Sequence, residues 1–423
     1  MIAVGFAGLT HLGLVSAVGT ASKGFDVLGY DADPDRVADI RAGKLPVVEP
    51  DLEAMAAANA PRLKWSDRAE DLGRCDIVYI ATDVPTDDRG RSDLSGIAAL
   101  IDSVIPTLKP SAVLVVLCQV PPGFTRKVPL APERLYYQVE TLVFGRAVER
   151  ATSPERFIVG CADPAQPLPT GYAALLGAFG CPILPMRYES AELAKIAINC
   201  CLVASVSVAN TLAELSEGVG ADWHEIVPAL RLDRRIGRYS YLVPGLGIAG
   251  GNLERDLATV LRLSEEVGSE ASVISSFLAN SRHRRDWALR TLHREVLAAK
   301  PDATLGVLGL AYKENTHSTK NSPSLELISH VRHLPVRLFD PVVPSSAAGH
   351  PKAVDANAAL DAARGVDALL LMTPWPEFRK LQPADLANAM AGQVVIDPYR
   401  LLDPAQVRAA GLRHHSLGAG PSC

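Results

Sequence analysis

The chain has 423 residues, which at about 150 residues per domain predicts two or three domains. Hydrophobic residues make up 48% and charged residues 21%, which excludes a disordered, collagen-like or disulfide-rich chain. The net charge of −5 provides no basic field for a phosphate backbone or an anionic membrane, so we expect neither nucleic-acid nor membrane partners. Because no apolar run approaches the ~20 residues that span a bilayer, and the N-terminus enters a strand pattern directly, we expect a cytoplasmic protein.

Two stretches of alternating strand and helix patterns flank a middle segment of long helix patterns. Strands are predicted at 2–7, 25–30, 77–81, 112–117 and 157–160, and again at 304–310, 336–340, 368–373 and 394–397. This alternation is typical of doubly wound parallel sheets. We therefore predict an α/β protein with two Rossmann-like domains, 1–185 and 296–423, joined by a helical middle domain, 186–295, which a glycine-rich loop at 244–251 interrupts.

The first predicted strand runs into a glycine-rich turn that opens a helix. The turn follows the pattern G-x-G-x-x-G, and its candidate cofactor residues are Gly8, Thr10, His11, Leu12 and Gly13. Backbone amides at such a helix N-terminus bind a pyrophosphate. Thr10 stands where the middle glycine is expected, so it either shifts the phosphates or donates its hydroxyl to them.

An acidic residue ends the second predicted strand. Asp31 lies 23 residues after Gly8, where a carboxylate binds the ribose diol and repels a 2′-phosphate. NAD is therefore predicted as the cofactor in preference to NADP. The alternative is that Asp31 only caps a turn with Asp33 and Pro34.

Several further segments, in this order, resemble those of the UDP-glucose/GDP-mannose dehydrogenase family over nearly the whole chain. The segments are 43–52, 92–94, 120–123, 191–199, 309–323, 340–341 and 373–378. The resemblance implies NAD in the first domain, a nucleotide sugar in the last, with a UDP-sugar expected, and a homodimer formed through the helical middle. It also implies two successive NAD-dependent oxidations of an alcohol to an acid.

The chain departs from the family pattern at positions tied to this chemistry. In the segment that resembles G-G-S-C-x-x-K-D, Asn252 stands at the cysteine, and an amide cannot form the thiohemiacetal of the second oxidation. Phe144 replaces a family glutamate, and Cys118 and Gln119 replace its Ser-Thr pair. Where the resemblance implies further cofactor contacts, the chain has Val84, Pro85, Gln119 and Lys320.

The residues that remain are sufficient for one hydride transfer. Lys195 and Asn199 are four residues apart and face the same side of a predicted helix. Alcohol oxidation needs a base and a positive donor for the developing alkoxide, roles that Lys195 can serve. The candidate catalytic residues are Lys195, Asn199, Asp256, Glu140 and Asn252. The alternative is that Lys195 and Glu192 are solvated helix charges.

A glycine-rich loop and two basic residues are candidates for contacts to the sugar and its diphosphate, although the loop could equally be a plain surface loop. The candidate substrate-binding residues are Arg235, Tyr241, Gly247, Gly250, Gly251 and Lys313. The seven cysteines are scattered without metal-type spacing, so no metal site is expected. Cys118 is the one cysteine that could replace the missing thiol, against the alternative of a core thiol, and Cys200 and Cys201 are expected to pack.

The favoured hypothesis is an NAD-dependent nucleotide-sugar dehydrogenase that performs one two-electron oxidation of an alcohol to a carbonyl. Two alternatives remain open at this point. The chain could be a non-catalytic relative that binds a nucleotide sugar or accompanies an active enzyme, or it could oxidise or epimerise a different sugar carbon.

Overall fold

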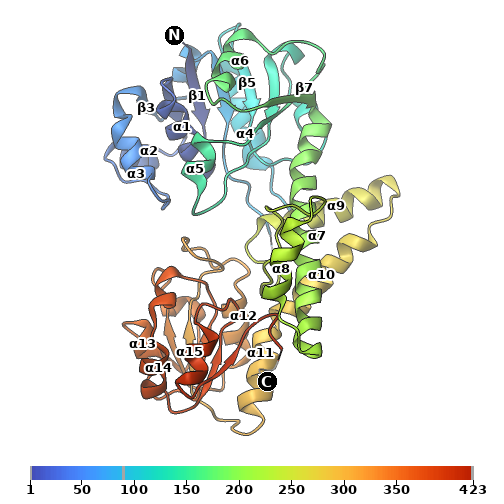
Figure 1. Cartoon of the computed structure of the whole chain (residues 1–423). Helices are drawn as coiled ribbons and strands as arrows, with labels where there is room; N and C mark the ends of the chain where they lie inside the picture. The colour runs from blue at the N-terminus through green and yellow to red at the C-terminus, as the bar shows by residue number, and fades with distance from the viewer. Residues whose placement is uncertain (1, 88–90, 421–423) are drawn as a thin grey trace. The chain divides into compact units, whose positions relative to one another are not determined.

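The computed structural model describes residues 2–87 and 91–420, which divide into two compact units at Ile198 (Figure 1). The first unit contains a mostly parallel sheet whose strand order is β3-β2-β1-β4-β5-β6-β7-β8. Its strands are β1 (Ala3–Ala7), β2 (Asp26–Tyr30), β3 (Leu63–Ser66), β4 (Ile77–Ile80), β5 (Val113–Val116), β6 (Leu135–Gln138), β7 (Phe157–Cys161) and β8 (Ile183–Arg187). The pairing of β6 with β7 is antiparallel, and the other pairings of this sheet are parallel.

Helices cover both faces of this sheet, as Figure 1 shows. They are α1 (His11–Ser22), α2 (Pro34–Arg41), α3 (Leu52–Ala58), α4 (Ser95–Val104), α5 (Ala147–Thr152) and α6 (Thr170–Gly177). The apolar residues of α1, α5 and α6 pack in one core on one face, and those of α4 pack in another. Central strands such as β4 and β5 are therefore apolar and buried along their whole length.

The strand order reverses between β1 and β4, which lie side by side at the centre of the sheet. The register pairs Ala7 with Ile80, so both strands end at the same edge. In open α/β sheets a ligand crevice forms at this reversal, outside the carboxyl ends of the strands. The loops that follow Ala7 and Ile80 therefore border the predicted cofactor site.

The second unit combines helices with a parallel sheet of order β11-β10-β9-β12-β13-β14. The long helix α7 (Tyr188–Val219) carries the boundary between the units, and α8 (Trp223–Leu232), α9 (Asn252–Val267), α10 (Ser272–Arg285) and α11 (Trp287–Leu292) follow. The strands are β9 (Leu305–Leu308), β10 (Val336–Phe339), β11 (Ala353–Asp355), β12 (Ala368–Leu371), β13 (Val394–Ile396) and β14 (Arg413–His415). The remaining helices are α12 (Pro323–His330), α13 (Ala359–Ala362), α14 (Pro383–Ala389) and α15 (Pro404–Ala409).

The second sheet repeats the local design of the first. Gly8 and Gly309 follow the central strand of each sheet, with φ of 95° and 93°. Asp31 and Asp340 follow the next strand, and each carboxylate accepts a hydrogen bond from the residue after the glycine, at 2.8 Å from Leu9 N and 2.6 Å from Leu310 N. The repeat explains why the two parts of the sequence carry similar glycine-rich openings.

The predicted α/β class with two doubly wound sheets and a helical centre is confirmed, and every predicted strand is present. The sequence pattern did not predict β3, β6, β8, β11 and β14. These strands are short, and four of them interleave polar, charged or proline residues, as in the Arg-His-His sequence of β14. They lack the continuous apolar run that identified the central strands.

Within the described residues, α7 is long and apolar enough to cross a membrane by length and composition alone. Buried residues make up 39% of its most apolar window, and its two ends carry charged side chains with partners in the protein. The structure therefore places α7 as a partly buried core helix.

Candidate functional site

The turn after β1 can be formed only by glycine at its two ends. A Cβ on Gly8 would lie 2.9 Å from Thr82 Cβ, and a Cβ on Gly13 would lie 1.8 Å from the Gly8 carbonyl oxygen. Helix α1 then starts at His11 with no side-chain cap and no acidic residue in its first turn. The first-turn amides of α1 are thus left for an anion, as a bound pyrophosphate requires.

Thr10 joins this turn to the loop after β4. Its hydroxyl accepts a hydrogen bond from the backbone amide of Asp83 at 2.9 Å. Asp83 directly precedes Val84 and Pro85, so the structure brings these predicted cofactor residues to the same edge of the sheet. An accepting hydroxyl still has a proton to donate, which agrees with the alternative that Thr10 contributes a hydrogen bond.

Asp31 lies at this edge as well, buried, with both carboxylate oxygens engaged. One oxygen accepts from Leu9 N at 2.8 Å and pairs with Arg36 Nη1 at 2.9 Å, and the other accepts from Asp33 N at 3.0 Å. Asp31 therefore makes the turn contact with Asp33 and also borders the glycine turn. Its role toward a ribose stays a prediction.

The sequence pattern predicted no role for Glu49, yet this residue organises one side of the glycine turn. Its fully buried carboxylate contacts His11 Nε2 at 2.8 Å and accepts from the amides of Gly145 and Ala147 at 2.9 and 3.2 Å. The ring of Phe144 lies 4.1 Å from that of His11. Burial raises the pKa of Glu49, but the hydrogen bonds from His11 and the two amides outweigh it and hold the pKa below its usual value. The Glu-Pro-Asp segment at 49–51 was the signal available in the sequence.

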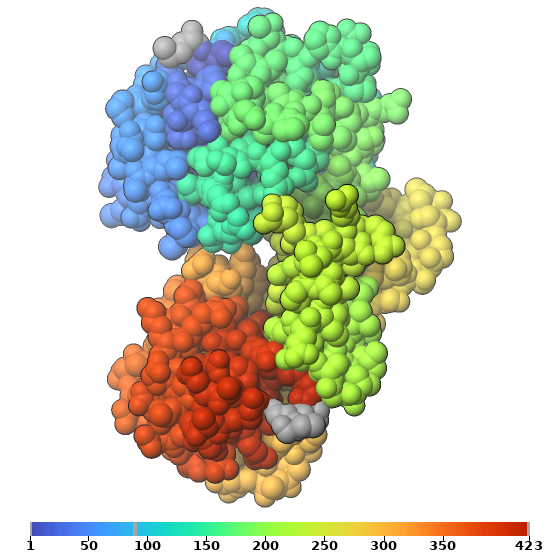
Figure 2. All heavy atoms as spheres, viewed as in Figure 1, coloured from blue at the N-terminus to red at the C-terminus, as the bar shows by residue number. Residues whose placement is uncertain are grey.

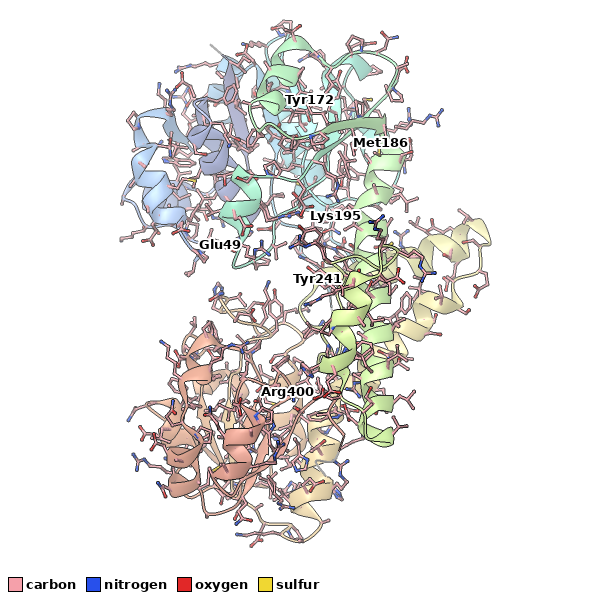
Figure 3. The ribbon with its side chains drawn as sticks, in the orientation of Figure 1. Glu49, Tyr172, Met186, Lys195, Tyr241 and Arg400 are labelled. Carbon is pink, nitrogen blue, oxygen red and sulfur yellow. The ribbon has the colours of Figure 1, made fainter. Side chains whose placement is uncertain are left out.

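Lys195, labelled in Figure 3, is bound to the loop that follows β6. Its Nζ donates to the Glu140 carbonyl oxygen at 2.8 Å and to Glu140 Oε2 at 3.1 Å, and the two side chains are only 13% and 15% exposed. Three residues earlier on α7, the buried carboxylate of Glu192 accepts from the amides of Gly123 and Thr125 at 2.6 and 2.8 Å. The alternative that Lys195 and Glu192 are solvated helix charges is therefore wrong.

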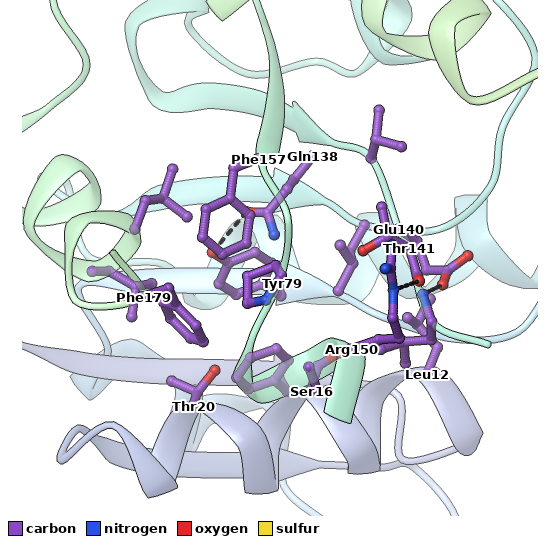
Figure 4. Close-up of a pocket in the computed structure, with 18 residues that line it drawn as sticks. Leu12, Ser16, Thr20, Tyr79, Gln138, Glu140, Thr141, Arg150, Phe157 and Phe179 are labelled. Atoms are coloured by element: carbon purple, nitrogen blue, oxygen red, sulfur yellow. Dashed lines mark hydrogen bonds between the residues drawn. The ribbon is translucent and has the colours of Figure 1, made fainter. Parts of the chain in front are cut away.

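A small cavity of about 60 Å³ lies beneath the Glu140 loop, between α1 and the sheet (Figure 4). Gln138 Oε1 accepts hydrogen bonds there from the hydroxyls of Tyr79 and Tyr172, at 3.1 and 3.0 Å. Burial raises the pKa of both tyrosines, so their hydroxyls stay protonated donors. These bonds fix the end of β6, from which Glu140 projects.

In the second unit, Asn199 and Asp256 form a buried pair. Asn199 Nδ2 donates to Asp256 Oδ2 at 2.5 Å, and Arg255 Nε lies 3.5 Å from the other carboxylate oxygen. Asn252 is the first residue of α9 and is exposed, one helical turn before Asp256. Three of the predicted catalytic residues thus lie on two helices that the Asn199–Asp256 bond holds together.

The candidate substrate loop closes on the start of the C-terminal sheet domain. Gly250 has φ of 79°, and its amide donates to the Lys320 carbonyl at 3.0 Å. A Cβ on Gly250 would lie 3.1 Å from the ring of Tyr312, over which the Lys313 ammonium lies at 5.6 Å. Gly251 lies beside Lys320. Lys320 therefore belongs to the second unit, and its predicted role in cofactor binding stays a prediction.

The outer part of this loop is exposed, next to α8 on the yellow-green surface in Figure 2. Arg235 pairs with Asp233 at 3.0 and 2.6 Å, and Tyr241 is 52% exposed. Gly247, by contrast, is held with φ of 75° against Ser281, where a Cβ would lie 2.4 Å from the Ser281 carbonyl oxygen. The predicted contact of Arg235 with a diphosphate stays a prediction.

Cys118 is buried at the end of β5 and is not a nucleophile. Its Sγ–H donates to the Ile80 carbonyl at 3.2 Å, and the sulfur accepts from Thr82 N at 3.3 Å. Burial raises the pKa of Cys118 to about 12, so the thiolate is absent near neutral pH. Cys118 is a core thiol, and the neighbouring Gln119 is half-buried.

A parallel sheet with a glycine turn, an acidic residue after the second strand and an uncapped helix N-terminus defines a dinucleotide-binding domain. The UDP-glucose/GDP-mannose dehydrogenase family provides three matching sequence profiles, for its NAD binding domain over 2–170, its central domain over 189–282 and its UDP binding domain over 306–404. The chain belongs to this family of NAD-dependent nucleotide-sugar dehydrogenases.

Individual relatives align over nearly their whole length. UDP-glucose 6-dehydrogenase TuaD of Bacillus subtilis is 28% identical, with 97% of this chain and 92% of that protein covered. UDP-glucose 6-dehydrogenase of Pseudomonas aeruginosa is 29% identical, with 97% and 96% covered. The solved UDP-glucose dehydrogenase of Pyrobaculum islandicum is 27% identical and superimposes with a TM-score of 0.85 over 99% of this chain and 98% of that one.

Proposed function

We propose that the protein oxidises a UDP-sugar, of the UDP-glucose class, from alcohol to carbonyl in a single two-electron step. The observation that carries the proposal is Asn252, which stands where the resemblance implies the cysteine of the second oxidation. The identity to UDP-glucose 6-dehydrogenases, about 28%, supports the substrate class. Without a thiol, the aldehyde is not held as a thiohemiacetal and leaves as the product.

The glycine turn fits NAD because its geometry leaves no space for side chains and its helix N-terminus has no cap of its own. We assign the pyrophosphate to the turn from Gly8 to Gly13 and the adenosine ribose to Asp31. Val84, Pro85 and Gln119, at the ends of the next two strands, would border the rest of the cofactor. When bound, NAD supplies the hydride acceptor.

Lys195 is assigned to the hydroxyl that is oxidised. Its ammonium is held by one carboxylate and one carbonyl at the edge of the Glu140 loop, and it retains a third donor for a substrate oxygen. A positive donor at that oxygen stabilises the developing alkoxide while the hydroxyl proton passes to water. Glu140 acts as a positioning residue in this assignment.

Asn199 and Asp256 are assigned to a water molecule or to the sugar hydroxyl. The amide has a second N–H and a carbonyl oxygen beyond its bond to Asp256. Asn252, exposed one turn from Asp256, offers a neutral amide instead of a nucleophile. This arrangement can orient a carbonyl or its hydrate but cannot trap it covalently.

The cysteines near these residues do not restore the missing thiol. Burial raises the pKa of Cys200 to about 11, with Asp256 as a further cause, and Cys200 packs in an apolar cluster. Cys201 lies two residues from Asn199, about 200° around the helix, and so points away from it. The expectation that Cys200 packs is confirmed, whereas Cys201 is exposed.

The nucleotide sugar is assigned to the UDP binding domain and the glycine loop before α9. Gly250 and Gly251 allow close approach of a sugar beside Tyr312. Arg235 and Lys313 are the cations assigned to the diphosphate, and Tyr241 and Gly247 complete the loop that would enclose the sugar.

We also propose a homodimer formed through α7. Four exposed apolar side chains, Val208, Leu212, Leu215 and Val219, are spaced by four, three and four residues and form a single stripe, 40–69% exposed. An apolar stripe of this length on a core helix is typical of a subunit interface.

A substrate screen tests the proposal. The full chain is incubated with NAD and individual UDP-sugars, and NADH is followed by absorbance while product masses are measured. The proposal requires NADH formation with a product two hydrogens lighter than a UDP-hexose. Tight binding of UDP-sugar and NAD without any NADH would instead support a non-catalytic relative. Oxidation at a carbon other than C6, located by deuterium-labelled substrates, would support the other alternative.

A further inference from the structure

His11 lies in the glycine turn that is assigned to the pyrophosphate, as the first residue of α1. Its imidazole is only 9% exposed, and its Nε2 lies 2.8 Å from Oε1 of Glu49, a residue labelled in Figure 3. The ring also lies against that of Phe144, with centroids 4.1 Å apart. Two neighbours therefore fix the direction and the plane of the imidazole. The sequence contains no other histidine before His224, so His11 is the one imidazole of the first unit.

The carboxylate of Glu49 determines which nitrogen of His11 carries a proton. Burial alone would raise the pKa of Glu49, but its hydrogen bonds lower it, so the carboxylate is ionised near neutral pH. An ionised carboxylate only accepts hydrogen bonds, and Nε2 of His11 is therefore the donor. In a neutral imidazole the other nitrogen, Nδ1, then has a lone pair and no proton.

The Nδ1 atom is available to a ligand at this turn. Among residues 2–87 and 91–420, none forms a hydrogen bond with Nδ1 of His11. Because Nδ1 is bonded to Cγ, it stays closer than Nε2 to the backbone of the first turn of α1. That turn has neither a side-chain cap nor an acidic residue. An anion that binds its amides therefore comes close to Nδ1.

Two opposing effects act on a second proton at His11. The partial positive charge of the helix N-terminus disfavours an imidazolium, whereas the carboxylate of Glu49 favours it. A pyrophosphate at the turn adds negative charge beside the helix N-terminus and shifts the balance towards the imidazolium. An imidazolium carries a proton on both nitrogens, so Nδ1 becomes a donor to a phosphate oxygen.

Within the described part of the chain, Glu49 is the charged group that His11 contacts. Helix α1 packs against β1, β2, β3, α3 and α5. The other charged side chains of these elements and of the loops at the turn either pair with groups other than His11 or are exposed. The pairs are Asp31 with Arg36, Glu140 with Lys195, Lys44 with Asp39, Arg146 with Glu149 and Arg150 with Glu155. The exposed residues are Asp26, Asp51, Glu53, Lys64 and Asp83. Tyr30, on β2, is uncharged near neutral pH because burial raises its pKa further.

We propose that His11 is a ligand of the NAD pyrophosphate and binds a proton together with the cofactor. The inference rests on the proposed assignment of the pyrophosphate to the turn from Gly8 to Gly13. The proton comes from solvent and is held on Nδ1, between the imidazole and a phosphate oxygen. Because the complex binds more protons than the free protein, the affinity for NAD is highest at the acidic end of the range in which imidazoles titrate and falls as the pH rises through it.

Calorimetric titration of the full chain with NAD, in two buffers of different heats of ionisation at about pH 7, counts the protons taken up. The pyrophosphate of NAD is a diester without a proton to exchange near neutral pH, so any uptake belongs to the protein. We expect uptake of up to one proton per chain. The dissociation constant for NAD should rise about tenfold between about pH 6 and about pH 8, as the charge-assisted hydrogen bond is lost.

His11→Gln separates the proton from the packing, because its amide keeps a donor for Glu49 but does not titrate. This variant should bind NAD without proton uptake and about tenfold more weakly at about pH 6. His283→Gln is the matched control. Nε2 of His283 also lies 2.8 Å from a glutamate, Glu214, but the side chain is 52% exposed and belongs to the second unit. The control should take up as many protons as the unaltered protein.

Thermal unfolding of each variant establishes that it is folded. If His11→Gln does not fold, Glu49→Gln replaces it and should reduce the uptake, because the negative charge beside the imidazolium is gone. The proposal is overturned if the unaltered protein binds NAD without taking up protons, or if the uptake is unchanged in the variant that folds. A protein that does not bind NAD at all would overturn the cofactor assignment as well, so the two failures are distinguishable.

Discussion

Replacing Lys195 by alanine removes the ammonium that the proposed mechanism needs at the reacting oxygen. The side chain is 13% exposed and makes two bonds to Glu140, at 2.8 and 3.1 Å. If the same ammonium stabilises the alkoxide, its loss should reduce kcat/KM by ~10²-fold or more, equivalent to about 2.7 kcal/mol of transition-state stabilisation. The affinity for NAD should stay largely unchanged, because the bonds that hold Asp31 and Thr10 at the glycine turn do not involve Lys195.

Stopped-flow absorbance of NADH with a UDP-sugar measures the effect on hydride transfer, and cofactor fluorescence measures NAD binding. Glu140→Gln is the matched control, since it keeps the loop and removes only the charge that Lys195 pairs with. If Lys195 merely anchors the Glu140 loop, both single variants should lose the same activity and the double variant should lose no more. That result, or unchanged turnover in Lys195→Ala, would refute the catalytic assignment.

Three further outcomes are expected. Asp31→Ala should reduce the preference for NAD over NADP, because the carboxylate that repels a 2′-phosphate is gone. Equal dissociation constants of the unaltered protein for NAD and for NADP would contradict this. Replacing both Leu212 and Leu215 by glutamate should convert a dimer to a monomer in sedimentation. The control Val354→Glu, at an exposed position of β11 in the C-terminal sheet, should leave the dimer intact. An unaltered protein that is already a monomer would contradict the proposed dimer. The depressed pKa of Glu49 means that its contribution to stability is present above about pH 4.3 and is lost as the pH falls through its folded-state pKa. In urea unfolding, the free energy of unfolding of Glu49→Gln should therefore fall less between pH 5 and pH 3 than that of the unaltered protein. Equal decreases in the two proteins would show that Glu49 is not responsible.

The central parts of both sheets could be predicted because their strands are buried on both faces and therefore continuously apolar. Edge strands such as β14 contain charged residues, since one side of each meets solvent, and they give no such pattern. The glycine turn could equally be predicted from the sequence, because Gly8 and Gly13 lie so close to neighbouring atoms that any side chain would clash.

Long-range polar contacts were beyond prediction. Glu49 and Gly145 are separated by 96 residues, and Glu192 and Gly123 by 69, so spacing along the chain contains no sign of either bond. A lone lysine and glutamate on a helix are more often solvated, and only the fold reveals that Lys195 and Glu192 are enclosed. The burial that makes Cys118 unreactive is likewise a property of the packed sheet end.

The number of NADH molecules formed per substrate molecule tests the central claim most directly. A limiting UDP-sugar is converted to completion under excess NAD, with hydroxylamine present in a parallel reaction to trap a carbonyl as its oxime. The absence of a thiol at Asn252 predicts one NADH per substrate and a product recovered as the carbonyl, its hydrate or the oxime. Two NADH per substrate with quantitative uronic acid, undiminished by the trap, would contradict the single-step assignment and require a second oxidation that does not depend on a cysteine.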